Sequence, residues 1–182
     1  MKVHQTGIQN LLIIEPKVFS DERGYFFEAF NKKLFHEHEL HYDFVQDNQS
    51  KSAYGVIRGL HFQTSPFAQT KLVRVLEGAI IDVAIDIRTN SETFGKHYKI
   101  LLSAENHKQF LIPKGFAHGF SVITANAVVM YKCDEFYNKE AERGFRFDDP
   151  YWKIDWEIDQ QDAIISEKDL IHPAFSVNQQ YF

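Results

Sequence analysis

The sequence lacks a second cysteine, a long hydrophobic run and any excess of positive charge. Cys133 is the only cysteine in 182 residues, so no disulfide can form within the chain and a reducing compartment is expected. No stretch approaches the roughly 18 apolar residues of a membrane-spanning helix, and the first residues do not resemble a signal peptide. A net charge of −5 offers no basic field for nucleic acid or anionic membranes. We therefore expect a cytoplasmic protein that binds neither nucleic acid nor a membrane.

The chain also lacks low-complexity segments, Pro/Gly-rich linkers and internal repeats. Without these boundary signals, and with 44% hydrophobic residues, a single domain over residues 1–182 is predicted. Cys133 ends the apolar run 128–133. We interpret it as a strand residue without chemistry.

Aromatic residues are abundant, at 15% of the chain, with 17 Phe and 8 Tyr. Short runs of β-branched and aromatic residues alternate with turn signals, which predicts an all-β sandwich or barrel. The expected strands are 11–19, 25–30, 55–62, 71–76, 79–87, 97–102, 108–112, 118–123 and 127–133.

Helical signals are few and peripheral. Asn31 is expected to cap a short helix over 32–37, a second helix is expected over 159–165, and a third is expected to begin at 166–169. The spacing of the histidines at 36, 38 and 41 fits no single helix face. We interpret this stretch as a solvated surface segment rather than a metal site.

The segment 82–88 alternates with a period of two residues, as a β-strand does. Val83, Ile85 and Ile87 share one face, and Asp82, Ala84 and Asp86 share the other. Two interpretations remain open: the polar face is exposed to solvent, or it faces a ligand cavity inside a barrel.

The stretch from Gly55 to Gly78 combines a histidine and a lysine at informative spacings. His61 follows Gly55 after five intervening residues, and Gly78 follows Lys71 after six. A second motif, Pro-Lys-Gly-Phe-Ala-His, occupies 113–118. These spacings resemble the two motifs of metal-binding cupins, in which three histidines and one glutamate hold a cation. They predict a cupin-type jelly-roll β-barrel with a few short peripheral helices.

Two of the four ligand positions have changed type. Gln63 stands at the second histidine position and Lys71 at the glutamate position. An ammonium repels a cation, and an amide oxygen is a poor replacement for imidazole. His61 and His118 alone fall short of the three ligands usual in a catalytic site. We therefore predict that the pocket holds no metal.

The remaining side chains suit acid–base chemistry. A neutral imidazole such as that of His61 is a competent general base near neutral pH. The ammonium of Lys71 can stabilise a developing oxyanion. Together they suit removal of a proton beside a carbonyl group. Return of the proton from the opposite face needs a second acid, and Tyr131 in the expected last barrel strand is the candidate.

Several further segments resemble those of the dTDP-4-dehydrorhamnose 3,5-epimerase family. They occur in order over roughly residues 5–175, and the most specific are Arg-Gly-Leu-His-Phe-Gln and Ile-Pro-Lys-Gly-Phe-Ala-His-Gly-Phe. The matching segments are 19–24, 44–48, 58–63, 71–75, 82–88, 112–120, 142–144, 148–150 and 166–169.

The resemblance implies a cofactor-independent isomerase that inverts carbons 3 and 5 of dTDP-4-dehydro-6-deoxy-D-glucose, in the biosynthesis of dTDP-rhamnose and surface polysaccharide. It assigns His61 as the base and Asp169 as the carboxylate that orients it. Lys71 would stabilise the enolate, and Tyr131 would donate the proton.

The resemblance also implies residues that contact the dTDP-sugar and a homodimer in which the N-terminal segment reaches the partner's site. Phe19 and Tyr137 are suggested to stack on the thymine base. The implied substrate-binding residues are Arg23, Glu28, Gln46, Asp47, Asn48, Arg58, His118, Glu142 and Lys168.

Two departures bear on the exact sugar. Phe62 stands where many family members have tyrosine, and the segment 151–157 lacks the usual glycine and proline. Relatives with the same histidine and tyrosine invert only one carbon. The alternatives are thus a 3- or 5-mono-epimerase, a metal-dependent cupin and a non-catalytic sugar-binding cupin.

Overall fold

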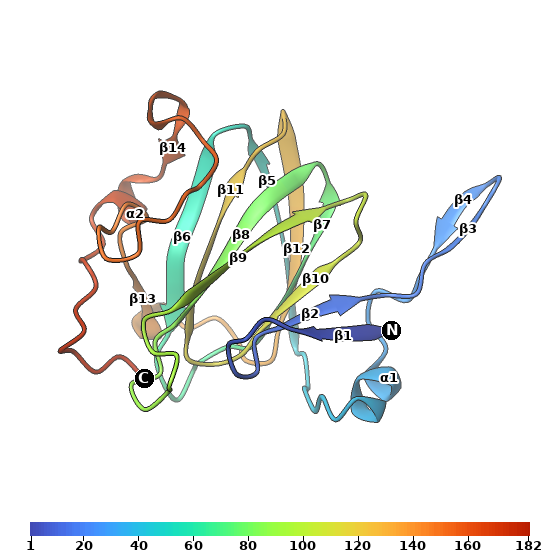
Figure 1. Ribbon diagram of the computed structural model, residues 1–182, viewed down its shortest axis with the longest axis horizontal. Coiled ribbons are helices and arrows are strands. Elements are labelled where there is room, and N and C mark those ends of the chain that lie inside the picture. Colours follow the sequence, from blue (N-terminus) through green and yellow to red (C-terminus); the bar gives the residue numbers. More distant parts are fainter.

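The computed structural model describes residues 1–182 and consists mainly of two antiparallel sheets packed face to face (Figure 1). One six-stranded sheet has the order β1-β2-β10-β7-β12-β5, and the other has β13-β6-β11-β8-β9, with β14 beside β6. The strands are β1 Lys2–Gln5, β2 Leu12–Glu15, β3 Phe19–Asp21, β4 Gly24–Phe26, β5 Gln46–Ala53, β6 Val56–Gln63, β7 Lys71–Glu77, β8 Ala79–Asp86, β9 His97–Ser103, β10 Gln109–Ile112, β11 Phe116–Val122, β12 Asn126–Cys133, β13 Glu142–Gly144 and β14 Ile164–Ile165.

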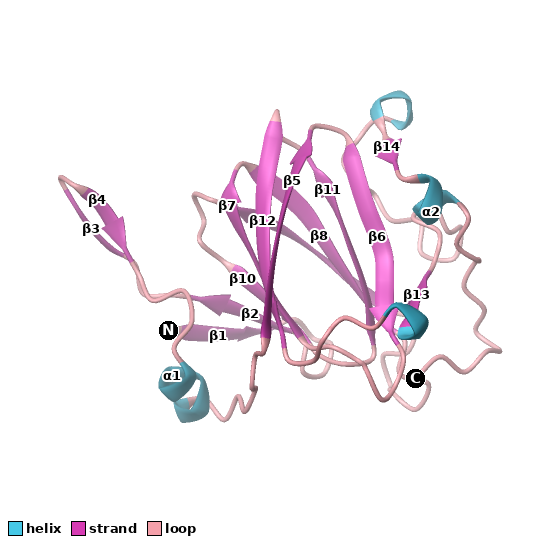
Figure 2. Cartoon of the chain, turned by 180° about the vertical axis from the view of Figure 1, so that it is seen from behind, coloured by secondary structure: helices cyan, strands magenta, loops and turns pink.

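The predicted all-β jelly-roll architecture is therefore confirmed. The expected strand 11–19 is interrupted, because β2 ends at Glu15 and a separate strand, β3, begins at Phe19. β3 and β4 form a hairpin that stands away from both sheets (Figures 1 and 2). β5 was not predicted, because its sequence QDNQSKSA carries polar residues on both faces.

The helices are short. α1 (Lys32–Glu37) begins where predicted, and the Asn31 side chain accepts hydrogen bonds from the backbone N–H groups of Lys33 and Leu34. α2 (Glu167–Leu170) begins after Ser166. The helix expected over 159–165 is wrong: a 3-10 turn at Gln160–Asp162 leads directly into β14. A second 3-10 turn covers Lys139–Ala141. None of the helices has the length and apolar character needed to cross a membrane.

Apolar side chains fill three regions. Between the sheets, residues such as Val73, Phe110 and Phe120 form the main core. The C-terminal segment covers the outer face of β6, β8 and β11, where Trp152 and Phe175 pack on strand residues. A third cluster lies under α1, on the outer face of β2, β7 and β10. Toward one end of the sandwich, the two sheets carry polar side chains on their facing sides.

The first interpretation of segment 82–88 is wrong, because Asp82, Ala84 and Asp86 are all buried rather than exposed to solvent. Val83, Ile85 and Ile87 face outward but are covered by the C-terminal segment. Asp82 is buried inside the barrel, where its Oδ1 lies 2.8 Å from Nε2 of His118. The apolar face is therefore a second core, and the polar face looks inward.

A β-bulge in β6 aims His61 into the barrel. His61 pairs with His118 and Arg58 pairs with Phe120, so three steps along β6 match two along β11. Leu60, between them, packs on the outer cluster. Without the extra residue, strand alternation would send His61 outward when Arg58 points inward.

Gly59 permits this bulge. Its φ is +126°, and an added Cβ would lie 2.5 Å from Cα of Gly119. We expect Gly59→Ala to lower the free energy of unfolding by about 2–4 kcal/mol, through backbone strain and a clash that cannot relax easily. Denaturant unfolding measures the change. Gly24→Ala is the matched control, because Gly24 has a similar φ of +119° but open space around its Cβ position. Equal losses of stability in Gly59→Ala and Gly24→Ala would contradict the close approach of Gly59 to Gly119.

Candidate active site

His61 and Asp169 form a hydrogen-bonded pair, with Nε2 of His61 2.7 Å from Oδ1 of Asp169. Asp169 is buried, and its Oδ2 accepts a hydrogen bond from the Gly59 N–H. Burial alone raises the pKa of Asp169, but the hydrogen bonds and the charge of His61 outweigh it and leave the pKa lowered. An ionised carboxylate only accepts, so Nε2 carries the hydrogen and Nδ1 is left to take up a proton.

The sequence folds so that this pair comes from opposite ends of the chain. His61 lies on β6, and Asp169 lies in α2, whose start is fixed by Ser166: its Oγ accepts from the Asp169 N–H. β14, paired in parallel with β6, brings the segment before α2 alongside β6. The pairing of Asp169 with His61, implied earlier only by resemblance, thus has a geometric basis.

Two adjoining hollows share His61, Lys71 and Tyr131. The larger has a volume of about 510 Å³, and the smaller has about 270 Å³. Arg58, His118, Lys168 and Asp169 also line the larger hollow. Gln46, Asn48, Gln63, Tyr137 and Glu142 line the smaller one.

Lys71 and Tyr131 come from neighbouring strands, β7 and β12, of the sheet that faces His61. Nζ of Lys71 lies 5.8 Å from the centre of the Tyr131 ring. Burial lowers the pKa of Lys71, although the nearby acidic groups of Cys133, Asp82 and Glu142 oppose the shift. Burial raises the pKa of Tyr131, so its phenol keeps the proton that a general acid must donate.

Burial shifts the pKa values of His118 and Cys133 in opposite directions and keeps both groups uncharged. Burial lowers the pKa of His118, against the opposing effect of Asp82, so a neutral imidazole donates to that carboxylate. Cys133 is fully buried, and burial raises the pKa of its thiol to about 11. A thiol with such a pKa stays protonated near neutral pH and is a poor nucleophile.

Gln63 is committed to the fold rather than to the cavity. Its Nε2 donates to the carbonyl oxygen of Phe67 at 2.6 Å and to that of Phe136 at 3.2 Å. Its Oε1 accepts from the Asn138 N–H at 2.7 Å. The side-chain oxygen at the second histidine position of the cupin motif is therefore already used as a hydrogen-bond acceptor.

Polar residues at the rim are tied together in pairs. Glu142 accepts a hydrogen bond from the Tyr137 hydroxyl at 2.8 Å and pairs with Nζ of Lys168 at 2.6 Å. Gln46 Nε2 donates to Asn48 Oδ1 at 3.0 Å. Arg58 donates to Ser52 at 3.0 Å. The cavity thus carries cations and amides around the base, as an anionic, oxygen-rich ligand requires.

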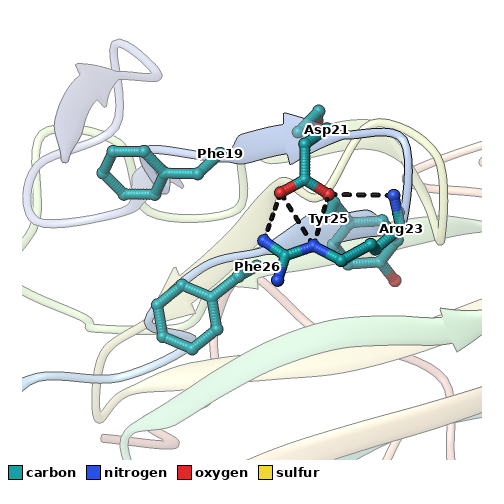
Figure 3. A pocket seen from close by; sticks show the side chains of 7 residues that line it. Phe19, Asp21, Arg23, Tyr25 and Phe26 are labelled. Atoms are coloured by element: carbon teal, nitrogen blue, oxygen red, sulfur yellow. Dashed lines mark hydrogen bonds and ion pairs between the residues drawn. The ribbon is translucent and has the colours of Figure 1, made fainter.

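Three predicted substrate-binding residues lie outside these hollows. Asp47 is on the opposite face of β5 and pairs with Lys132. Glu28 accepts from Asn31 before α1. Arg23 lies in the β3–β4 hairpin, where Asp21 holds its guanidinium (Figure 3). The exposed rings of Phe19 and Phe26 lie on the same hairpin.

Sequence reasoning did not single out Asp82, Gly119 or His172. Asp82 was visible as a polar residue in an alternating strand, and Gly119 follows His118 in the second motif. His172 carried no sequence signal, since it stands apart from every motif. Its ring contacts the position where Gly144 would carry a Cβ, with Nε2 2.5 Å away.

We expect Asp169→Asn to lower kcat by about 10–100-fold with little change in KM, because the amide no longer fixes the tautomer of His61 or stabilises its protonated form. Steady-state rates with the nucleotide sugar test this. Ser166→Ala, which removes a helix cap but leaves the carboxylate, is the control. An unchanged kcat in Asp169→Asn would contradict a working His–Asp pair.

A barrel histidine held by a carboxylate, opposite a lysine and a protonated tyrosine, is the arrangement of a cupin-type enzyme that moves protons with its own side chains. The model of the dTDP-4-dehydrorhamnose 3,5-epimerase family matches residues 5–176. The chain therefore belongs to that family.

Individual relatives are similar to this chain over nearly their whole length. The Shigella flexneri dTDP-4-dehydrorhamnose 3,5-epimerase is 50% identical over 100% of this chain and 99% of its own. The crystal structure of the Elizabethkingia anophelis enzyme is 55% identical, with a TM-score of 0.94 over 100% of this chain and 99% of the other. A Legionella pneumophila enzyme crystallised with dTDP-4-keto-L-rhamnose is 45% identical, with a TM-score of 0.88 over 96% and 98% of the chains.

Proposed function

We propose that this isomerase converts dTDP-4-dehydro-6-deoxy-D-glucose into dTDP-4-dehydro-L-rhamnose by inverting carbons 3 and 5, in dTDP-rhamnose and surface polysaccharide biosynthesis. The observation that carries the proposal is the His61–Asp169 pair. Its hydrogen bond uses Nε2 of His61 and leaves Nδ1 free, and His61 lines a cavity together with Lys71 and Tyr131. The names of relatives at 50% identity and above support the same substrate.

The proposed chemistry is two rounds of proton removal and return. Nδ1 of His61 takes the proton from a carbon beside the keto group, and the electron pair moves onto the keto oxygen. Lys71 stabilises this enolate oxygen, although burial lowers its pKa. Tyr131 returns a proton to the opposite face of the carbon, which inverts the centre. Exchange with solvent then removes the proton from His61 and restores the Tyr131 phenol before the second round. None of these steps needs a metal or an organic cofactor. That the enzyme uses neither remains a prediction.

The polar rim is proposed to hold the dTDP part of the substrate. Arg58 and Lys168 line the larger hollow, and guanidinium groups match phosphate oxygens well. Tyr137, with 54% of its surface exposed at the smaller hollow, offers a ring face to the thymine base. Gln46, Asn48, His118 and Glu142 are proposed as contacts to sugar and base.

A homodimer is proposed to complete the site. The β3–β4 hairpin holds Arg23 and three exposed aromatic side chains (Figure 3), and it projects away from the two sheets (Figure 1). Exposed aromatic surface of this kind marks an interaction site. Residues Phe19, Arg23 and Glu28 would thereby reach the cavity of a partner. Sedimentation velocity measures the mass in solution, and a monomer at working concentration would contradict this arrangement.

The deciding experiment counts deuterium. After incubation with the 4-keto-6-deoxy nucleotide sugar in heavy water, the product of a double epimerase carries deuterium at two positions, carbons 3 and 5. A single labelled position would instead identify a mono-epimerase, and binding without any exchange would identify a non-catalytic sugar-binding protein. Iron, manganese or zinc required for the exchange would point to a metal-dependent cupin. The single domain over 1–182 and the cytoplasmic location stay predictions.

A further inference from the structure

His172 lies behind the His61–Asp169 pair without a hydrogen-bond partner. Its side chain is 13% exposed, and its Nε2 is 3.7 Å from Oδ1 of Asp169, beyond hydrogen-bond distance. Its ring centre is 5.6 Å from that of His61. A buried polar atom left unpaired costs about 1–3 kcal/mol, so a buried nitrogen aimed at a carboxylate calls for a ligand or a function.

Together, His61, Asp169 and His172 form a set of metal-ligand type. One ligand atom from each lies within 4.8 Å of the other two. Two imidazoles and one carboxylate suit divalent transition ions, and three protein ligands plus a water is the usual number in an open zinc site. Tetrahedral zinc holds its ligand atoms about 3.4 Å apart. The 2.7 Å contact therefore has to open by about 0.7 Å, and the 3.7 Å contact has to close by about 0.3 Å. The imidazole nitrogens of His61 and His172, which lie within 4.8 Å of each other, have to approach by up to about 1.4 Å.

This set differs from the cupin metal position. It does not use Gln63 or Lys71, and two of its members come from the C-terminal segment rather than from the barrel motifs. The nearest rim charges, Lys168 and Glu142, are paired with each other at 2.6 Å and largely cancel. The carboxylate of Asp169 therefore remains as the local negative charge that attracts a cation.

We propose that a divalent transition cation, with Zn²⁺ as the probe, binds His61, Asp169 and His172 and inhibits the enzyme. The cation takes Nε2 of His61 and Oδ1 of Asp169, in place of the hydrogen bond between them. The imidazole then keeps its hydrogen on Nδ1, the nitrogen that must accept the substrate's proton. The site is thus inhibitory rather than catalytic. The inhibition rests on the proposed function, whereas the binding does not.

Calorimetric titration of the purified full-length chain with Zn²⁺ tests the binding. One site per chain is expected, and His172→Ala and His172→Gln should each weaken it at least tenfold. The Gln variant keeps most of the side-chain volume, so it guards against a folding defect, and thermal melting checks both variants. The control is His36→Ala/His41→Ala, because these exposed rings lie 4.8 Å apart and are the obvious adventitious zinc site. Loss of binding in this double variant, or unchanged binding in the His172 variants, would overturn the proposal.

Epimerase rates test the inhibition. Each variant is compared with its own rate in the presence of a chelator, and Zn²⁺ should inhibit the unmodified enzyme at concentrations that leave the His172 variants active. Equal inhibition of all variants would overturn an inhibitory role for this site. If the chelated enzyme does not act on the nucleotide sugar at all, the proposed function fails while the calorimetric result stands by itself. Visible absorption of bound Co²⁺ gives a readout independent of activity, and its loss in His172→Ala is expected.

Discussion

His61→Asn is expected to lower kcat by about 10³-fold or more and to abolish exchange of substrate hydrogens with solvent. A positioned general base contributes roughly 10²–10⁴-fold, and here the same nitrogen serves two carbons. The asparagine side chain is shorter than histidine, and its amide nitrogen superimposes on Nδ1 rather than on the Nε2 that bonds to Asp169. It therefore loses that hydrogen bond, and it accepts no proton at neutral pH. Proton NMR in heavy water follows the signals at carbons 3 and 5 directly.

The control for this substitution is His38→Asn, which makes the same chemical change on the exposed surface near α1. It should exchange both hydrogens at the normal rate. Thermal melting measures the stability that His61→Asn loses with the hydrogen bond to Asp169. The variant is expected to remain folded, because His61 is partly exposed to the cavity. Exchange at either carbon at an undiminished rate in His61→Asn would remove His61 from the role of base.

Tyr131→Phe is expected to separate exchange from inversion. His61 and Lys71 remain in place, so proton removal continues, and His61 can return a solvent deuteron to the face from which it took the proton. Inverted product should form about 10²-fold more slowly, while deuterium accumulates in the starting sugar. The raised pKa of Tyr131 supports this role, because the phenol remains protonated through the working pH range. NMR distinguishes labelled starting sugar from inverted product.

Tyr137→Phe provides the matched comparison at the same cavity. Its hydroxyl donates to Glu142 rather than facing a free space, and its ring is half exposed. Removing that hydroxyl should alter KM more than the ratio of exchange to inversion, since the ring is kept. If Tyr137→Phe allowed exchange without inversion and Tyr131→Phe did not, Tyr137 rather than Tyr131 would be the proton donor.

Much of the fold was readable from pattern because the strands are short runs of β-branched and aromatic residues separated by turn signals. Runs 71–76 and 127–133 are examples, and their strands begin and end within two residues of the predicted bounds. β5 was missed because its inner face, with Gln46 and Asn48, serves a cavity rather than a core. The segment 159–165 was predicted to be a helix because its sequence pattern does not reveal that β14, at its end, pairs in parallel with β6.

The cavity residues were identified unevenly. The motif spacing was enough to select His61, Lys71 and His118, and the expected last strand suggested Tyr131. Resemblance supported Tyr131 and added Asp169. Asp82 was left undecided, because an alternating strand looks the same whether its polar face meets water or a buried histidine. His172 could not be found at all, since its place behind Asp169 depends on how the last segment crosses the outer sheet.

The class of fold and the kind of chemistry can be read from the amino-acid sequence alone. Strand periodicity is a local property, and the replacement of two cupin ligands by Gln63 and Lys71 is a change of residue type that can be read without coordinates. The direction in which His61 points depends on the three-dimensional fold, which decides it because a bulge of one residue at Gly59 reverses strand alternation. The fold also decides which groups surround that histidine. Asp169 and His172 are more than 100 residues away along the chain, and only packing of the C-terminal segment on β6 brings them to it.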